Sequence, residues 1–481
     1  METIFWHDYE TFGADTRKDR PCQFAGVRTD LDLNIIEDPV TLYCKPSDDF
    51  LPSPDACLIT GITPQYAYQK GVSEVEFANF IHAIFSVPGT CVAGYNSIRF
   101  DDEVSRNLFY RNFYDPYERE WKNGNSRWDI IDLVRLCYAL RPDGLNWPMD
   151  DKGQPSFRLE RLTEANNIAH EAAHDAMSDV YATIAVAKLI KEKQPQLYDY
   201  VFRHRTKSSL VPFFENKEMK PVFHVSSKYP ASLGCSALVL PLFKNPHNSN
   251  GYVVFDLRQN PEDLYALDNE EIKARLYSKG AELKEQNKFR PALKTIHINK
   301  CPMVSPASVI KSISNDRLLG WGLDLTLMTQ HMAWIRSKPE FISKIYSIFN
   351  EPSIFPSEAD PDLMIYSGFL GPIDKKLLAE VRASTEFDLA EKEFHFVDPR
   401  LPEMLLRYKA RNFPATLNEE EQETWEAYRA AKLLDGNSQY LTFNAYFERI
   451  QEISNEEHIT ARDLNILEDL KYYAESILPY Y

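Results

Sequence analysis

Several features that would place this chain in a special class are missing from its sequence. No apolar run approaches the roughly 20 residues of a membrane-spanning helix, and the N-terminus lacks the basic region and long apolar stretch of a secretory signal. The seven cysteines are scattered, odd in number and without a Cys-X-X-Cys pair. We therefore expect reduced thiols in a cytoplasmic protein, rather than disulfides, a zinc site or a membrane partner.

A net positive charge is also lacking, since 54 Lys and Arg residues against 71 Asp and Glu residues give a formal net charge of −17. This argues against a protein that is held on nucleic acid by bulk charge, although it leaves a local basic groove open. The 44% of apolar and 26% of charged residues are ordinary for a globular protein. Aromatic residues are frequent at 13%, which indicates large contact surfaces as well as cores.

The length of 481 residues corresponds to two or three domains. Residues 1–194 alternate between strand and helix patterns, which predicts an α/β domain with a mixed sheet. Residues 195–349 contain short apolar segments separated by Pro, Asn and Gly, which predicts a β-rich domain with helices within 262–285 and 304–348. Residues 350–481 are acidic and predict a helical C-terminal domain.

The element pattern of the first domain can be given residue by residue. Strands are predicted at Ile4–Trp6, Cys22–Thr29, Asn34–Tyr43 and Thr90–Asn96, and helices at residues 72–87, 127–140 and 178–193.

In the stretch METIFWHDYETFG, the first of these strands is followed closely by two acidic residues, Asp8 and Glu10. Alternation along a strand predicts that Asp8 and Glu10 point to one side and Tyr9 to the other. Two like charges this close are costly in a core unless a positive group joins them. On these residues alone two interpretations stay open, namely acids at a strand end that face water, or part of a metal site.

Two further stretches could complete a metal site. The segment YNSIRFDDEVSRN (95–107) places Asp101 after an apolar strand and a turn, and AHEAAHDAMSDVYATIAVAKLI (169–190) places His174 at a helix start with Asp179 five residues later. Taken singly, each segment is typical of a solvated helix start. Together, the three stretches read DxE, FDD and HxxxxD, which is a far more specific pattern.

This pattern resembles the DEDDh family of 3′→5′ exonucleases. Longer stretches carry the resemblance over nearly the whole chain and, within that family, to the bacterial exonuclease I family; they include DRPCQFAGVRTD, GYNSIRFDDEVSRNLFYRNFYDPY, SFRLERLTEAN and YKARNFPATL. The resemblance implies an RNase H-like mixed-sheet exonuclease domain, an SH3-like β-rich domain and a helical C-terminal domain.

The resemblance also assigns metal ligands. It implies that Asp8, Glu10 and Asp179 bind the metal and that Asp101, rather than Asp102, is the fourth acid, because the family has a phenylalanine–aspartate step at this point. The implied cofactor is a pair of Mg²⁺ ions, for which Mn²⁺ is expected to substitute. Mg²⁺ prefers oxygen ligands and shares them with substrate phosphate.

His174 is implied to be the general base that deprotonates the attacking water near neutral pH. Glu10 and Arg158 are implied to contact the substrate near the active site. For Arg158, an ordinary arginine on a helix surface is the alternative.

The stretch 106–128 interleaves basic and aromatic residues. Aromatic rings stack on unpaired bases while Arg and Lys bind phosphates. The resemblance implies that Arg106, Tyr117, Trp121 and, further on, Arg135 contact single-stranded DNA. Most of the other aromatic residues in this stretch are expected in the core.

A partner is implied as well. Family members bind the acidic C-terminal tail of single-stranded DNA-binding protein, and a basic, partly apolar pocket for that tail is expected at Arg141, Tyr200, Arg317 and Arg336. The chain is expected to be a monomer.

The expected function is Mg-dependent, processive 3′→5′ degradation of single-stranded DNA to 5′-mononucleotides in DNA repair and recombination. An RNA or proofreading-type exonuclease and a non-catalytic single-strand-binding protein are the alternatives. The long extension beyond residue 194 argues against a minimal RNA nuclease, and the presence of all five site residues argues against a protein that only binds.

Overall fold

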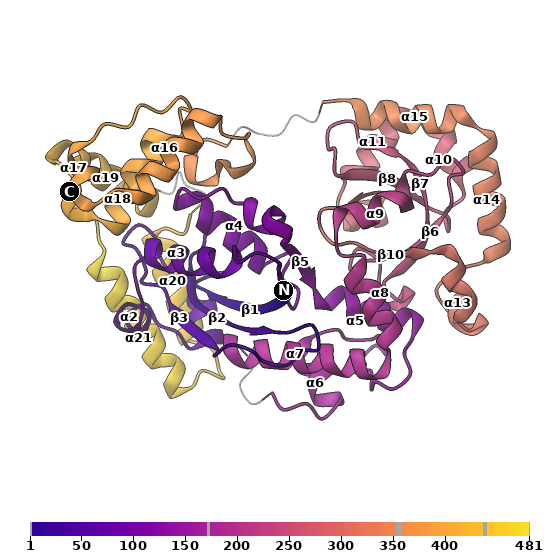
Figure 1. Cartoon of the computed structure of the whole chain (residues 1–481), viewed down its shortest axis with the longest axis horizontal. Helices are drawn as coiled ribbons and strands as arrows, with labels where there is room; N and C mark the ends of the chain where they lie inside the picture. Colours follow the sequence, from indigo (N-terminus) through magenta and orange to yellow (C-terminus); the bar gives the residue numbers. More distant parts are fainter. Residues whose placement is uncertain (1, 171–173, 353–357, 436–439, 481) are drawn as a thin grey trace. The chain divides into compact units, whose positions relative to one another are not determined.

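The computed structural model describes most of the chain (Figure 1). It covers residues 2–170, 174–352, 358–435 and 440–480. Among these residues, no helix combines the length and the apolar character that a bilayer crossing would require.

The chain divides into two compact units, which we call unit 1 and unit 2. Unit 1 comprises Met1–Ser126, His170–Ile184 and Pro356–Tyr481. Unit 2 comprises Arg127–Ala169 and Ala185–Phe355.

The first sheet has five strands in the order β3-β2-β1-β4-β5. Its strands are β1 (Thr3–Thr11), β2 (Pro21–Thr29), β3 (Val40–Tyr43), β4 (Thr90–Gly94) and β5 (Ser126–Asp129). Strand β1 pairs antiparallel with β2 and parallel with β4, and β2 pairs antiparallel with β3. The predicted mixed sheet is therefore confirmed.

Two predicted elements were partly wrong. Residues 127–129 belong to strand β5, and helix α5 (Ile130–Leu140) begins only after Asp129, whose carboxylate accepts a hydrogen bond from the backbone N–H of Ile131. The predicted strand at 34–43 is limited to β3, because Pro39 has no N–H to donate to the ladder.

One apolar cluster in unit 1 explains the direction of the first strand's side chains. Helices α3 (Glu74–Phe85) and α4 (Asp101–Arg111) share this cluster with Phe5 and Tyr9 of β1 and Phe24 of β2. The rings of Tyr9 and Phe24 lie 5.0 Å apart. Tyr9 therefore points into the core, and the pleat turns Asp8 and Glu10 to the opposite side, as the alternation predicted.

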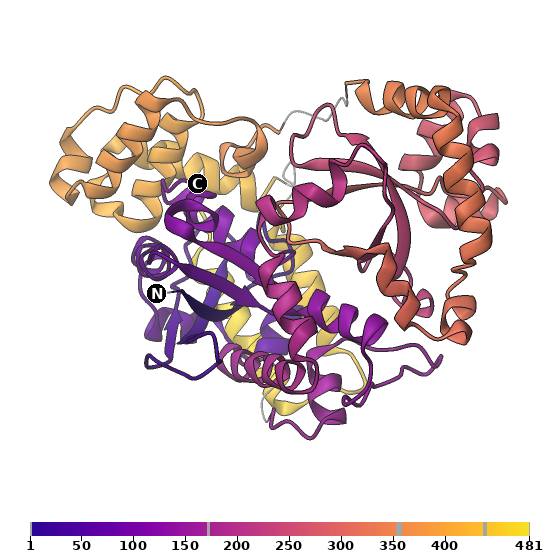
Figure 2. The ribbon, with the colours of Figure 1, turned by 45° about the vertical axis from the view of Figure 1, so that its right-hand side comes forward.

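The C-terminal helices complete unit 1. A second apolar cluster joins Phe12 and Cys22 to α1 (Pro54–Thr60), α2 (Pro64–Lys70), α20 (Phe443–Ser454) and α21 (Ala461–Ser476). Helix α21 packs on α1 and α2, and α20 packs on α1. In both views these yellow helices lie beside the indigo and purple N-terminal part of the chain (Figures 1 and 2).

A third cluster packs further C-terminal helices on the end of α4 through Tyr110 and Phe113. The helical elements of this part are η5 (Pro361–Tyr366), α16 (Pro372–Ala383), α17 (Glu386–Glu391), α18 (Leu401–Asn412), η6 (Pro414–Thr416) and α19 (Glu419–Leu433).

Buried charges reinforce these contacts. Arg411 of α18 donates to Asp49 at 2.8 Å and to Asp362 at 2.6 Å, and Lys432 of α19 donates to Asp49 at 2.8 Å. Asp49 is fully buried, so it depends on these cations to remain ionised.

Helix α7 (Ala176–Lys193) brings the last part of the predicted motif to the first sheet. The carboxylate of Asp175 accepts a hydrogen bond from the backbone N–H of Ser178 at 3.0 Å, which is an N-terminal cap. His174 therefore lies just before the N-cap residue of the helix, and Asp179 lies in its first turn, as the sequence predicted.

Unit 2 is built on a second five-stranded sheet in the order β10-β6-β7-β8-β9, with every neighbouring pair antiparallel. Its strands are β6 (Val222–Val225), β7 (Ser236–Lys244), β8 (Gly251–Asp256), β9 (Leu293–His297) and β10 (Met303–Pro306). The predicted β-rich segment is confirmed.

Helices lie in the two stretches where they were predicted, 262–285 and 304–348, and they pack around this sheet. Helix α14 (Leu325–Ser337) packs on α10 (Pro261–Ala266), and α15 (Pro339–Asn350) packs on α11 (Asn269–Tyr277) (Figure 1). The helices of unit 2 outside α5 and α7 are α6 (Leu159–Ala165), α8 (Pro195–Arg203), α9 (Lys207–Phe214), α10 (Pro261–Ala266), α11 (Asn269–Tyr277), α12 (Gly280–Glu285), α13 (Asn315–Gly320), α14 (Leu325–Ser337) and α15 (Pro339–Asn350).

Candidate active site

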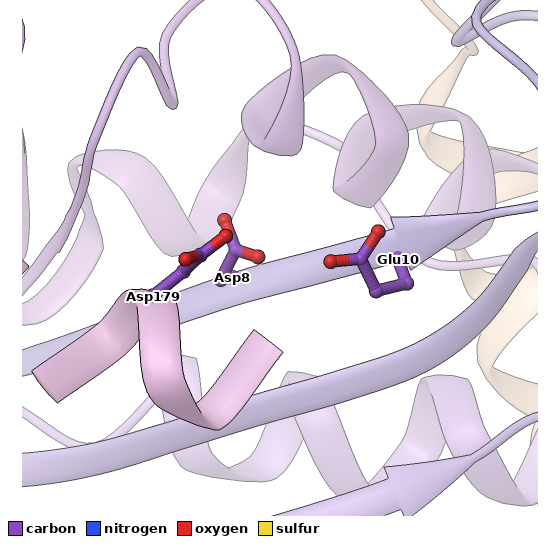
Figure 3. A group of neighbouring side chains, drawn as sticks. All are labelled: Asp8, Glu10 and Asp179. Carbon is purple, nitrogen blue, oxygen red and sulfur yellow. The ribbon is translucent and has the colours of Figure 1, made fainter. Parts of the chain in front are cut away.

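Three carboxylates from two elements of unit 1 converge. Asp8 and Glu10 project from the same side of β1, and Asp179 reaches them from the first turn of α7 (Figure 3). One oxygen of each carboxylate lies within 4.8 Å of the others. The structure therefore brings together the three residues that the sequence pattern singled out as metal ligands.

A fourth acid stands beside them. Asp101, the first residue of α4, is 2% exposed, and its Oδ1 accepts a hydrogen bond from the backbone N–H of Tyr9 at 3.1 Å. Its negative charge acts on both Asp8 and Glu10. The neighbouring Asp102 is instead held by Arg119, whose Nη2 lies 2.6 Å from its Oδ1.

The four acids disturb one another's ionisation. Burial, followed by the charges of Asp101, Glu10 and Asp179, raises the pKa of Asp8 well above its usual range. Burial and the charges of Asp179 and Asp101 raise the pKa of Glu10 to about 8. Like charges at this distance need a proton or a cation between them.

The donor set fits a hard divalent cation. All of the converging ligand atoms are carboxylate oxygens, which are the ligands that Mg²⁺ and Mn²⁺ prefer, and no sulfur or imidazole atom belongs to this group among the described residues. A cation would offset the repulsion that raises the pKa of Asp8 and Glu10. The residues present therefore suit the metal that the sequence implied.

Two histidines accompany Asp179. His174 is exposed and has a left-handed backbone with φ 67°, and its backbone N–H donates to the Asp179 carboxylate. His170 places its Nε2 2.5 Å from Oδ1 of Asp179. His170 was not predicted, because the HxxxxD spacing selects His174 alone.

Gln23 was also missed. It lies on β2 directly opposite Glu10, is 2% exposed, and donates through Nε2 to the hydroxyl of Tyr43 at 3.0 Å. Its Oε1 has no hydrogen-bond partner within the part of the chain that the structure describes. Only the strand register places Gln23 beside Glu10, and the register cannot be read from either strand alone.

The predicted DNA-contact residues of unit 1 have different surroundings. Arg106 is buried and donates to Glu120 at 2.7 Å and to Glu103 at 2.7 Å. The Tyr117 ring lies 5.3 Å from the Arg106 guanidinium carbon. Trp121 is 66% exposed and offers an open indole face.

The predicted DNA-contact residues of unit 2 also differ from each other. Arg135 is 8% exposed and donates to Asp132 at 2.6 Å. Arg158 has an exposed side chain that lies 4.0 Å from the carboxylate of Glu160. Contact of either residue with DNA stays a prediction.

Residues predicted to bind the partner's acidic tail lie in unit 2. Arg141 donates to the hydroxyl of Ser312 at 2.7 Å, and Arg317 donates to the carbonyl of Tyr138 at 2.7 Å, so both lie where α5 meets the segment around α13.

The other two predicted tail contacts have separate partners. The hydroxyl of Tyr200 donates to the carbonyl of Val304 at 3.0 Å. Arg336 donates to the carbonyls of Glu218 and Met219. Binding of a tail at any of the four positions stays a prediction.

Three family models match the chain. They are described as Exonuclease (residues 5–187), Exonuclease I SH3-like domain (residues 205–351) and Exonuclease I C-terminal domain (residues 359–477). These matches confirm the predicted fold class, an exonuclease domain followed by an SH3-like domain and a C-terminal domain.

Curated relatives match over almost the full length. Exodeoxyribonuclease I of Haemophilus influenzae is 45% identical over 99% of this chain and 99% of its own. Exodeoxyribonuclease I of Escherichia coli is 43% identical over 99% of this chain and 98% of its own.

Solved structures of exonuclease I, two of them from E. coli, have the same fold. A complex with a dA16 oligonucleotide is 42% identical with a TM-score of 0.94, and covers 99% of this chain and 100% of that chain. A zinc-bound complex with single-stranded DNA is 42% identical with a TM-score of 0.93, and covers 99% of each chain. A complex of SSB and exonuclease I with an inhibitor is 41% identical with a TM-score of 0.90, and covers 99% of this chain and 100% of that chain.

Proposed function

The chain belongs to the exonuclease I family and is a hydrolytic exonuclease, and from this premise we propose that it degrades single-stranded DNA processively from the 3′ end to 5′-mononucleotides. The observation that carries the proposal is the convergence of Asp8, Glu10 and Asp179, with Asp101 beside them, in an exonuclease domain. DNA repair and recombination are the proposed setting, and the cytoplasm is the proposed location.

Exonucleases of this kind use divalent metal ions, and we propose two Mg²⁺ ions, replaceable by Mn²⁺, for this chain. Asp8, Glu10 and Asp179 would bind them, and Asp101 would hold the second ion or its water. When bound, such ions supply positive charge to the attacking and leaving oxygens of the phosphodiester. The oxygen-only donor set supports this choice.

His174 is the proposed general base. It lies two residues before α7, and its exposed imidazole would take a proton from the attacking water. Its backbone N–H holds Asp179, so one residue links the base to a metal ligand.

The proposed DNA contacts are Glu10 and Arg158 near the reacting end, and Arg106, Tyr117, Trp121 and Arg135 along the strand. Trp121 has the strongest support as a direct contact, because its ring is open to stacking. Arg106 donates to two glutamates and its guanidinium lies against the Tyr117 ring, so in addition to its proposed DNA contact it would hold Tyr117 in place.

The proposed partners are single-stranded DNA and the acidic tail of single-stranded DNA-binding protein. E. coli exonuclease I is solved in complex with an oligonucleotide, and another solved complex contains SSB and exonuclease I. For the tail we propose Arg141, Tyr200, Arg317 and Arg336. The chain is proposed to act as a monomer.

Three consecutive domains are proposed at 1–194, 195–349 and 350–481. The three family matches, at 5–187, 205–351 and 359–477, support this division along the sequence.

The test uses one oligodeoxynucleotide, labelled separately at its 5′ and 3′ ends. It is presented single-stranded, as a duplex and as the equivalent RNA, with Mg²⁺ or with EDTA. We expect immediate release of the 3′ label as mononucleotide, from the single-stranded DNA alone and with Mg²⁺ alone. Asp8→Ala and His174→Ala should lose this release while they still bind the strand.

Other outcomes would redirect the proposal. Faster cleavage of RNA would favour an RNA exonuclease, and early release of the 5′ label would contradict the proposed polarity. Binding without cleavage under every metal condition would make the chain a single-strand-binding protein.

A further inference from the structure

The loop before α7 holds two histidines, and only one of them fits the motif of the family. We propose that the other, His170, is a positioning residue that holds the carboxylate of Asp179 in the orientation required for metal binding. This inference rests on the proposed function, because it presumes that Asp179 binds a divalent ion.

The contact between the two side chains is direct. Nε2 of His170 lies 2.5 Å from Oδ1 of Asp179, and the His170 side chain is only 5% exposed, against 21% for Asp179. An ionised carboxylate can only accept hydrogen bonds, so Nε2 of His170 must be the donor. A buried, charge-assisted hydrogen bond of this kind fixes the rotation of the acceptor.

Asp179 needs such a restraint. Its neighbours at the site are Asp8 and Glu10, whose negative charges favour rotation of the Asp179 carboxylate away from them. The donors that oppose this rotation are the His170 imidazole and the backbone N–H of His174. A carboxylate offers about four lone-pair sites, so one bond from His170 leaves room for a cation.

The same geometry separates the tasks of the two histidines. The Nε2 proton of His170 is committed to Asp179, so this nitrogen cannot accept a proton from water while the bond lasts. His174 is exposed and has a left-handed backbone, with φ 67°. His170 therefore orients a ligand, and His174 remains the residue that can take a proton.

Loss of such a support has a known scale. Mutation of a residue that orients a metal ligand typically costs about 10- to 100-fold in metal affinity or activity. His170→Leu removes the donor. His170→Gln retains an N–H donor at a similar reach, so it should restore most of the affinity.

The experiment measures binding of Mn²⁺ to the full-length protein without DNA, by isothermal titration calorimetry near neutral pH. We expect His170→Leu to weaken binding about 10- to 100-fold and His170→Gln to remain within about threefold of the wild type. His174→Gln is the matched control on the same loop, and it should bind Mn²⁺ like the wild type while it loses turnover. Thermal unfolding in EDTA verifies that each variant is folded.

Wild-type affinity in a folded His170→Leu variant would overturn the inference. Equal weakening by His170→Leu and His170→Gln would also overturn it, because a role in packing alone would then explain the loss. If neither the wild type nor Asp8→Asn binds Mn²⁺, the proposed metal site fails instead, so the two failures are distinguishable.

Discussion

Two adjacent aspartates at the start of α4 should respond to the same substitution in opposite ways. Asp101 faces the acids of β1 and accepts the backbone N–H of Tyr9, whereas Asp102 forms a buried ion pair with Arg119. Asparagine is isosteric with aspartate and retains an acceptor oxygen. Each substitution therefore removes one negative charge and little else.

The magnitudes follow from the surroundings of each charge. Arg119 is 1% exposed, so Asp102→Asn leaves a buried cation without its counter-charge, which costs about 3 to 5 kcal/mol. For a unit of this size, the lower value corresponds to a fall of about 6 °C in Tm. Asp101→Asn relieves repulsion at the site instead, and should raise stability in EDTA by about 1 kcal/mol.

The assay combines thermal unfolding in EDTA with turnover of a 3′-labelled single strand in Mg²⁺, measured well below both values of Tm. We expect Asp101→Asn to lose activity by about 100-fold or more, and Asp102→Asn to remain within a fewfold of the wild type. An inactive but stable Asp102→Asn variant would refute the assignment of Asp101. A strongly destabilised Asp101→Asn variant would refute the reasoning on repulsion.

Three further predictions concern acid stability, DNA binding and metal linkage. Burial alone would raise the pKa of Asp49, but Arg411 and its neighbouring cations hold this pKa well below its usual range. The unfolded chain therefore binds a proton at Asp49 more readily than the folded chain does. The stability that Asp49 contributes is complete above about pH 4, and it falls by about 1.4 kcal/mol per pH unit below it. Urea titrations that show no such decrease of stability in acid would contradict this prediction. Trp121→Ala should weaken the binding of single-stranded DNA in EDTA by about 1 to 3 kcal/mol without a change in Tm. Fluorescence anisotropy measures the affinity, and thermal unfolding measures the Tm. An unchanged affinity would show that Trp121 does not contact the DNA. Mg²⁺ at 100 times its Kd should stabilise the wild type by about 2.7 kcal/mol and leave Asp8→Asn unchanged in a thermal shift assay; an equal shift in both proteins would place the ion elsewhere.

Local patterns were sufficient to predict the acids of the first strand. A strand alternates its side chains, so Asp8 and Glu10 had to share a side and Tyr9 had to point to the other. The FDD and HxxxxD stretches supplied the other candidate site residues. The order of the three stretches along the chain indicated the family, and the resemblance to that family selected Asp101 rather than Asp102. The structure then placed Asp101 beside β1 and Asp102 on Arg119.

Features that depend on tertiary contacts were not predictable in this way. The apolar periodicity of residues 127–140 fits a helix, but Trp128 is fully buried within a short strand, its ring 5.2 Å from that of Tyr198. Gln23 lies beside Glu10 only through strand register. His170 contacts Asp179 through a side-chain hydrogen bond that the spacing of nine residues does not dictate.

The most direct test of the central claim is to locate the metal itself. Crystals of the protein soaked in Mn²⁺ and examined by anomalous diffraction should show a peak at about 2 Å from carboxylate oxygens of Asp8, Glu10 and Asp179. Asp8→Asn crystals treated in the same way should lose this peak or show it strongly reduced. A wild-type site without a peak, in crystals that bind Mn²⁺ elsewhere, would contradict the account.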